Sequence, residues 1–358
     1  MSAAADSASG RFARLRTRWK WLAAGVATAL LLFGLHALAA PERPRVAEAP
    51  VKVEIRARPT EGFEARDPTR RRFGQLEFRG GIELTSPYKE FGGISAIRVR
   101  PDGAQFLGLT DQSRWLRGRI VYDGVRPTGI ADAEMAPILG PDGKPLATRR
   151  WYDTESLAED GGTAYVGIER VHQIVRLDYG KNGLLARAQP IPVPPELKQW
   201  PSNGSIETLV FVPRGREPLA GTLIAIAERA FDDAGNIQGF LIGGRSPGGF
   251  AIKRSDEFEI SDGALLPSGD LVILERRYSL LRGVAMRIRR IPLAGIRPGA
   301  LVDGTVVVYA DLGYQIDNME GMSAHRTASG ETVLTLVSDD NFSAVQRTIL
   351  LQFTLVEE

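Results

Sequence analysis

Five similar segments between residues 93 and 340 place acidic and small polar residues where they could bind a cation. In each segment a polar residue opens a short apolar stretch, and a second apolar stretch after a turn ends in Asp or Glu. The segments begin at Gly93-Ile94-Ser95, Thr154-Glu155-Ser156, Ile206-Glu207-Thr208, Ser261-Asp262-Gly263 and Met319-Glu320-Gly321, and their second stretches end at Asp111, Glu169, Glu228, Glu275 and Asp339. Two antiparallel strands joined by a turn bring the start of the first and the end of the second to the same side. We therefore expect these polar positions to share one face of the protein.

Carboxylates that converge on one face would repel one another, and their pKa values would rise unless a cation neutralises them. The chain has no Cys and only three His, so the ligand atoms on offer are oxygens, which favour Ca²⁺ and, less strongly, Mg²⁺. Six to eight oxygens fill the shell of one Ca²⁺, so the set could serve more than one ion. The predicted metal ligands are Glu155, Glu169, Glu207, Glu228, Asp262, Glu275, Glu320 and Asp339.

Arginines next to three of these acids allow two further interpretations. Arg170, Arg229 and Arg276 each follow a strand-end Glu, and their forked donors could hold an anionic substrate such as a phosphate ester. A Ca²⁺ ion beside them would polarise the phosphoryl oxygen and activate water. Alternatively, the acids and arginines form a purely structural ring of salt bridges. The catalytic residue stays open, with Glu320, Asp339 and His325 as candidates.

The spacing of the segments predicts the fold. They start 61, 52, 55 and 58 residues apart, which is typical of a radial β-repeat. Short apolar strands from residue 94 onward can be counted in fours, but the last set has only three. The stretch Gln75–Leu84 can supply the missing strand, so that the two ends of the domain pair and close the ring. We therefore predict an all-β, five-bladed β-propeller, with six blades as the alternative.

The N-terminal region predicts export. Five basic residues between positions 11 and 20 precede the uncharged stretch Trp21–Ala40, which contains the cleavage-like sequence Ala37-Leu38-Ala39. Residues 1–40 are thus predicted to be a signal peptide or an uncleaved transmembrane anchor. Residues 41–72, rich in Pro, Arg and Glu, are predicted to be a linker, and residues 73–358 the propeller domain.

Charge excludes one class of partner. Without residues 1–39 the chain keeps 40 of its 45 basic and 42 of its 43 acidic residues, which gives a net charge of −2. A basic nucleic-acid-binding protein is therefore not supported. We expect a periplasmic or extracellular monomer that touches the membrane only through its N-terminal segment.

Several motifs resemble the phytase-like family, known as "esterase-like activity of phytase" proteins, which are typically bacterial and exported. They are Phe91–Ser95 (FGGIS), Asp153–Leu157 (DTESL), Leu274–Ser279 (LERRYS), Asp317–Met322 (DNMEGM), Leu334–Phe342 (LTLVSDDNF) and Gln346–Phe353 (QRTILLQF). The resemblance spans about residues 73–356 and implies a β-propeller that hydrolyses phosphate or other esters, with Ca²⁺ as its cofactor.

The sequence thus supports two functional hypotheses from different classes. The first is an exported, Ca²⁺-dependent phosphoester or other ester hydrolase that acts on a small anionic ester through metal-activated water. The second is a non-catalytic propeller of the cell envelope that binds a ligand or a protein partner. A shared fold does not decide between them.

Overall fold

The computed structural model describes residues 49–279 and 283–356. All of them belong to one compact unit, Val46–Glu358. The predicted signal peptide or anchor, residues 1–40, lies outside the described residues. Within the described ranges, no helix is both long enough and apolar enough to cross a bilayer.

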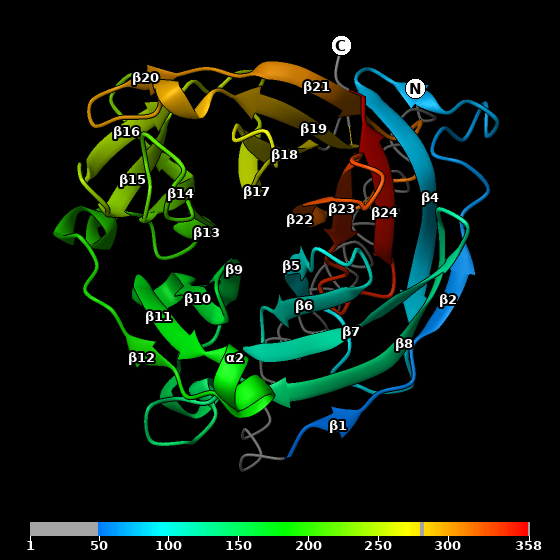
Figure 1. The fold of residues 1–358 in the computed structure, drawn as a ribbon, viewed down its shortest axis with the longest axis horizontal. Helices are drawn as coiled ribbons and strands as arrows, with labels where there is room; N and C mark the ends of the chain where they lie inside the picture. The colour runs from blue at the N-terminus through cyan, green and yellow to red at the C-terminus, as the bar shows by residue number, and fades with distance from the viewer. Residues whose placement is uncertain (1–48, 280–282, 357–358) are drawn as a thin grey trace, which may run out of the picture. The chain divides into compact units, whose positions relative to one another are not determined.

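Five antiparallel sheets surround a central axis and form the blades of the propeller (Figure 1). Blade 1 comprises β5 (Ile94–Val99), β6 (Gln105–Thr110), β7 (Arg114–Asp123) and β8 (Arg126–Pro137), with β1 (Val51–Lys52) at its outer edge. Blade 2 comprises β9 (Thr154–Asp160), β10 (Thr163–Ile168), β11 (Gln173–Asp178) and β12 (Gln189–Pro190). Blade 3 comprises β13 (Ile206–Phe211), β14 (Thr222–Phe231), β15 (Ile237–Gly243) and β16 (Gly248–Ile252), and β20 (Leu301–Val302) pairs with β16 in parallel.

Blades 4 and 5 complete the ring. Blade 4 comprises β17 (Glu259–Leu265), β18 (Leu271–Ser279), β19 (Gly283–Ile291) and β21 (Thr305–Ala310). Blade 5 comprises β22 (Met319–Arg326), β23 (Thr332–Ser338), β24 (Thr348–Leu355), β4 (Leu76–Thr85), β2 (Arg56–Pro59) and β3 (Arg72–Phe73). The helical turns are η1 (Leu146–Arg149), η2 (Glu169–Val171), α2 (Tyr179–Asn182), η3 (Gly183–Leu185), η4 (Pro195–Gln199) and η5 (Leu293–Gly295).

The ring closes where the start of the domain meets its end. Strand β4, which matches the predicted stretch Gln75–Leu84, pairs with the C-terminal strand β24 along its length. The five-bladed prediction and its closure are therefore confirmed. The segment predicted as a linker differs from expectation from residue 49 onward. It adds β1, β2 and β3 to blades 1 and 5, and Phe63 is fully buried among aromatic side chains, which is why this segment packs against the domain.

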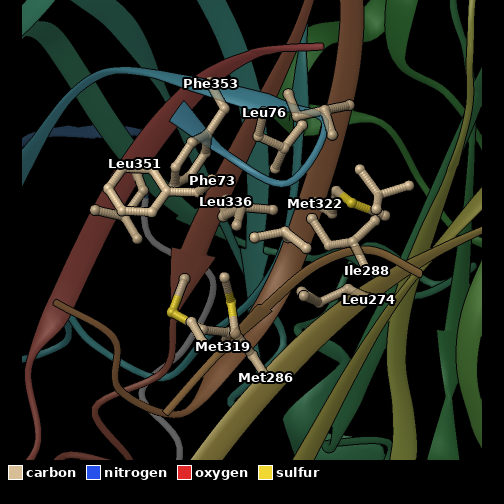
Figure 2. Packing of buried hydrophobic residues seen from close by; sticks show 14 of the residues in the cluster. Phe73, Leu76, Leu274, Met286, Ile288, Met319, Met322, Leu336, Leu351 and Phe353 are labelled. Atoms are coloured by element: carbon tan, nitrogen blue, oxygen red, sulfur yellow. The ribbon is translucent and has the colours of Figure 1, made fainter. Parts of the chain in front are cut away.

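Apolar side chains fill the spaces between neighbouring blades. Figure 2 shows Leu274 and Ile288 of blade 4 beside Met322 and Leu336 of blade 5, and all four belong to one buried cluster. The inner strands, such as β13 and β23, are buried on both faces, because a blade packs against a neighbour on each side. This explains why the inner strands read as nearly continuous apolar runs.

A β-bulge at the start of the innermost strand of every blade positions the polar residues. In each blade the pairing between the first and second strands skips one residue of the first strand. The five bulged residues are Ser95, Glu155, Glu207, Ser261 and Glu320. On the second strand, the residue that follows the partner of the residue just before the bulge is Asp111, Glu169, Glu228, Arg276 or Asp339 in blades 1 to 5, and in blade 4 the pairing continues to Arg276 itself. A bulge redirects a side chain out of the regular alternation, so these two sets can meet at one end of the axis.

Candidate functional site

Eight carboxylates gather at the end of the axis where these bulges lie, and we call them the carboxylate cluster. Three come from bulges, four from the ends of second strands, and Asp153 precedes the bulge of blade 2. The members are Asp111, Asp153, Glu155, Glu169, Glu207, Glu228, Glu320 and Asp339, and each acts electrostatically on at least one other. Six of the eight predicted metal ligands are therefore brought together.

Blades 2 and 3 provide the tightest group of oxygens. One carboxylate oxygen each from Glu169, Glu207 and Glu228 lies within 4.8 Å of the other two. Glu169 accepts hydrogen bonds from the backbone N–H groups of Gly204 and Ser205, which fixes its orientation. Glu207 is only 4% exposed, and its carboxylate lies 3.9 Å from Nη2 of Arg276, which is beyond hydrogen-bond distance. A buried carboxylate in that state favours the approach of a cation.

Arg276 of blade 4 lies among the carboxylates as an internal cation. Its Nη2 is 2.7 Å from Glu228, 3.1 Å from Glu320 and 3.9 Å from Glu207. Its Nη1 donates to Asn318. Arg276 occupies the strand-end position that holds an acid in the other four blades, so blade 4 contributes positive charge where the others contribute negative charge.

Two predicted ligands, Asp262 and Glu275, lie outside the carboxylate cluster. In blade 4 the bulged residue is Ser261 and the strand-end residue is Arg276, so each of these acids is one position away from the aligned position. Successive side chains of a strand point to opposite faces, and the offset turns both acids away. Asp262 instead binds Arg98 with both oxygens, at 2.7 and 2.9 Å, and Glu275 pairs with Arg287 and Arg289. Both acids are thus engaged in buried structural ion pairs.

The two other predicted arginines and the predicted histidine lie in different parts of the propeller. Arg170 pairs with Asp153, and Arg229 lies 2.9 Å from Glu259 and 3.3 Å from Glu228. His325 lies near the opposite end of β22, five residues or roughly 16 Å along the strand from Glu320. It is buried beside Gly103 in the turn between β5 and β6. His325 is therefore not placed to act with the carboxylate cluster.

The cluster raises the pKa values of its own members. Burial, followed by repulsion from Asp339 and Asp153, raises the pKa of Asp111 to about 8. The pKa of Glu320 rises to about 8 because burial outweighs the attraction of Arg276, and the pKa of Asp339 rises to about 6 mainly through burial. Burial and then neighbouring glutamates raise the pKa values of Glu155 and Glu207. Without a bound cation the site therefore retains protons near neutral pH.

These shifts predict that the metal-free protein loses stability as the pH rises. A carboxyl group with a raised pKa keeps its proton in the folded state after the unfolded chain, whose carboxyl groups titrate near pH 4, has released it. The stabilising contribution is complete below about pH 4 and disappears as the pH passes from 4 to 8. We expect a melting temperature several degrees lower at pH 8 than at pH 5.5 in EGTA. Glu320→Gln should flatten this dependence, and a melting temperature that increases with pH would contradict the prediction.

Sequence reasoning left Asp111 and Asp153 out of the predicted ligand set. Asp111 ends the second stretch of the first segment, so the repeat itself contained the signal. Its Oδ1 atom is buried and has no hydrogen-bond partner in the described part of the chain. Asp153 stands two residues before the bulged Glu155, and its backbone N–H donates to the carbonyl of Asp111. That contact joins blades 1 and 2. It depends on how the two blades pack, so the repeat pattern in the sequence did not indicate Asp153.

A sequence profile described as "Phytase-like: Esterase-like activity of phytase" matches residues 89–342. The matched range contains all eight members of the carboxylate cluster. The chain belongs to the phytase-like family. A search of curated proteins found no match to this phytase-like chain.

Three of the solved structures that are similar to this phytase-like protein have low sequence identity to it. Glutaminyl cyclase of Myxococcus xanthus is 13% identical, with 74% of this chain and 97% of that chain covered and a TM-score of 0.39. The Cps50 (Swd1) β-propeller domain of Myceliophteria thermophila is 8% identical, with 78% and 99% covered and a TM-score of 0.35. YCF48 bound to D1 peptide is 13% identical, with 74% of this chain but only 66% of that chain covered and a TM-score of 0.34. These likenesses concern the fold alone.

Proposed function

We propose that this phytase-like propeller is an exported, Ca²⁺-dependent hydrolase of phosphate or other esters, with its active site at the carboxylate cluster. The observation that carries the proposal is the excess of acidic over basic side chains, since eight carboxyl groups gather at one end of the axis and Arg170, Arg229 and Arg276 are the predicted arginines that pair with them. Family membership supports ester hydrolysis. The basic and apolar N-terminal stretch supports export.

The donor set fits a hard divalent cation. All candidate ligands are carboxylate oxygens, and the oxygens of Glu169, Glu207 and Glu228 are close enough to share one ion. The Oδ1 atom of Asp111 is buried without a hydrogen-bond partner among the described residues, and the buried Glu207 has Arg276 only at 3.9 Å, so a cation would supply both with a closer partner. Glu169, Glu207 and Glu228 would hold the ion, and Glu155 and Glu320 lie within their electrostatic reach.

Calcium bound there would supply positive charge that polarises an ester oxygen and increases the acidity of water. The residues of the chain have complementary roles in the proposal. Arg276 orients Glu228 and Glu320, and its charge favours an anionic group in the site. The side chain of Asn318 donates a hydrogen bond to Glu320 and accepts one from Arg276, and these two bonds fix the positions of both side chains relative to each other. Asp339 and Glu320, with raised pKa values, can exchange a proton with the reacting group near neutral pH.

Metal content and turnover test the proposal together. The purified protein is expected to contain Ca²⁺, to melt at a higher temperature with Ca²⁺ than with EGTA, and to hydrolyse at least one member of a panel of phosphomonoesters and carboxylic esters. Glu320→Gln and Asp339→Asn should each lower kcat/KM by about a hundredfold or more, which is the usual contribution of a positioned acid or base. A melting temperature indifferent to Ca²⁺ and EGTA, or turnover unaffected by both substitutions, would refute it.

One observation favours the alternative of a non-catalytic envelope propeller. Arg276 already neutralises part of the cluster through Glu207, Glu228 and Glu320, as a structural ring of ion pairs would require. In that case Arg276→Met would lower stability in the presence and absence of Ca²⁺ alike. The hydrolase proposal instead expects Ca²⁺ to recover most of the lost stability, because the ion can replace the missing charge.

A further inference from the structure

An aromatic ring borders the carboxylate cluster at blade 1. The position two residues before the bulge carries a side chain in four blades, namely Asp153, Ser205, Glu259 and Asn318. In blade 1 the same position is Gly93. A β-carbon added there would lie 2.6 Å from Cε2 of Phe342 and closer still to Oδ1 of Asp111. The Phe342 ring of blade 5 therefore occupies the space that a side chain of blade 1 would fill, directly beside a carboxylate of the cluster.

The loop after β23 holds this ring in a fixed and strained conformation. Asn341 and Phe342 both have left-handed backbones, with φ of 47° and 50°. A left-handed conformation is a genuine outlier for a bulky residue, so surrounding contacts must stabilise it. Asp340 supplies them, because its Oδ1 accepts the N–H groups of Gly93 and Phe342 at 3.0 and 3.1 Å and its Oδ2 accepts the hydroxyl of Thr348. Phe342 is nevertheless 39% exposed, so this residue offers apolar surface to solvent next to Asp111.

The charges around the cluster disfavour a substrate with many negative charges. Arg170, Arg229 and Arg276 are each already paired with a carboxylate. A polyanion would therefore find these three guanidinium groups already engaged, beside the eight carboxyl groups of the cluster. An ester with a single anionic or polarised group would not meet this difficulty, and its substituent would contact Phe342.

We propose that Phe342 is a specificity-determining residue, and that the site takes an ester whose reacting group carries an aryl or similarly flat apolar substituent, rather than a polyphosphorylated sugar. This inference rests on the proposed ester-binding site at the cluster. Phe342 contacts the substituent and takes no part in bond breaking. Stacking of two aromatic rings together with burial of their faces stabilises a complex by about 1.4 kcal/mol, which corresponds to a tenfold change in affinity.

Binding of non-hydrolysable probes tests the inference separately from catalysis. In Ca²⁺-loaded protein, isothermal titration is expected to show phenylphosphonate binding about tenfold more tightly than methylphosphonate, and more tightly than inositol hexakisphosphate. Phe342→Asn should abolish the preference for phenylphosphonate without weakening methylphosphonate, because Asn tolerates the left-handed backbone. Phe342→Tyr should retain the preference. Leu185→Ser is the matched control, since Leu185 is an exposed apolar residue in η3, after the strand β11 that leads away from the cluster, and it should change nothing.

The outcomes separate this inference from the proposed function. Equal affinities for the two small phosphonates, tighter binding of the hexakisphosphate, no binding of either phosphonate, or a preference that survives Phe342→Asn would each overturn the role of Phe342. Preferential binding of phenylphosphonate by a protein that hydrolyses no ester would support Phe342 and refute the hydrolase proposal. Ester hydrolysis without any preference for an aryl group would support the hydrolase proposal and refute the role of Phe342.

Discussion

Glu207→Gln is expected to abolish the stabilisation of the protein by Ca²⁺ while leaving the metal-free protein at least as stable. Glu207 is buried, lies 3.9 Å from the nearest nitrogen of Arg276, and repels Glu228, Glu155 and Glu320. Removing its charge relieves that repulsion and also deletes an oxygen ligand. A ligand at a hundred times its dissociation constant stabilises a protein by about 2.7 kcal/mol, and this is the contribution that we expect Glu207→Gln to lose. Thermal melting with Ca²⁺ and with EGTA measures the difference directly.

Glu134→Gln provides the matched control for this experiment. Glu134 lies in the outer strand β8, where it pairs with the half-exposed Arg117, far along the blade from the inner strand. Its substitution should leave the Ca²⁺-dependent shift intact. If Ca²⁺ increased the melting temperature of Glu207→Gln as much as that of the unaltered protein, the ion would bind elsewhere. Asp111 and Asp339 would then be the next ligands to test.

The fold was largely predictable from the sequence because propeller blades repeat. The spacing of five segments and the unpaired stretch Gln75–Leu84 were sufficient to predict five blades and the closure of the ring by β4 and β24. The short edge strands β1 and β2 were not predicted. Each pairs only at the margin of a sheet, and neither has an alternating apolar pattern of its own.

The positions of the site residues were predictable to within one residue along each strand. In blade 4 an error of one residue selected side chains that point away from the site. A bulge inserts one extra position into a strand, so an alignment based on acidic residues chose Asp262 and Glu275 in place of Ser261 and Arg276. The side-chain period of a strand is two, and a shift of one residue exchanges the two faces. The approach of Phe342 to Gly93 joins residues about 250 positions apart across the closure of the ring, so no comparison of repeats could have revealed it.

The Arg98–Asp262 pair is expected to be the most important ion pair for stability. Arg98 of blade 1 reaches Asp262 in blade 4 and also donates to the carbonyl oxygens of Leu209 in blade 3 and Met322 in blade 5. It thereby links four blades. Asp262 is fully buried, and its remaining partners are the N–H groups of Met322 and Gly263. Arg98→Met leaves this carboxylate without its counter-charge and should lower the free energy of unfolding by about 3–5 kcal/mol, as measured by urea denaturation.

A double-mutant cycle distinguishes the pair from general packing. Arg98→Met combined with Asp262→Asn removes both charges, so it should lose less stability than the two single substitutions added together. Arg117→Met, which breaks the more exposed pair with Glu134, is the control and should cost less than about 1 kcal/mol. If Arg98→Met costs no more than Arg117→Met, the blades are held together by their apolar clusters and by backbone pairing at the ring closure, and the central ion pair contributes little. If the predicted cost is found, the acidic residue that first suggested a metal ligand in blade 4 instead joins the blades across the axis.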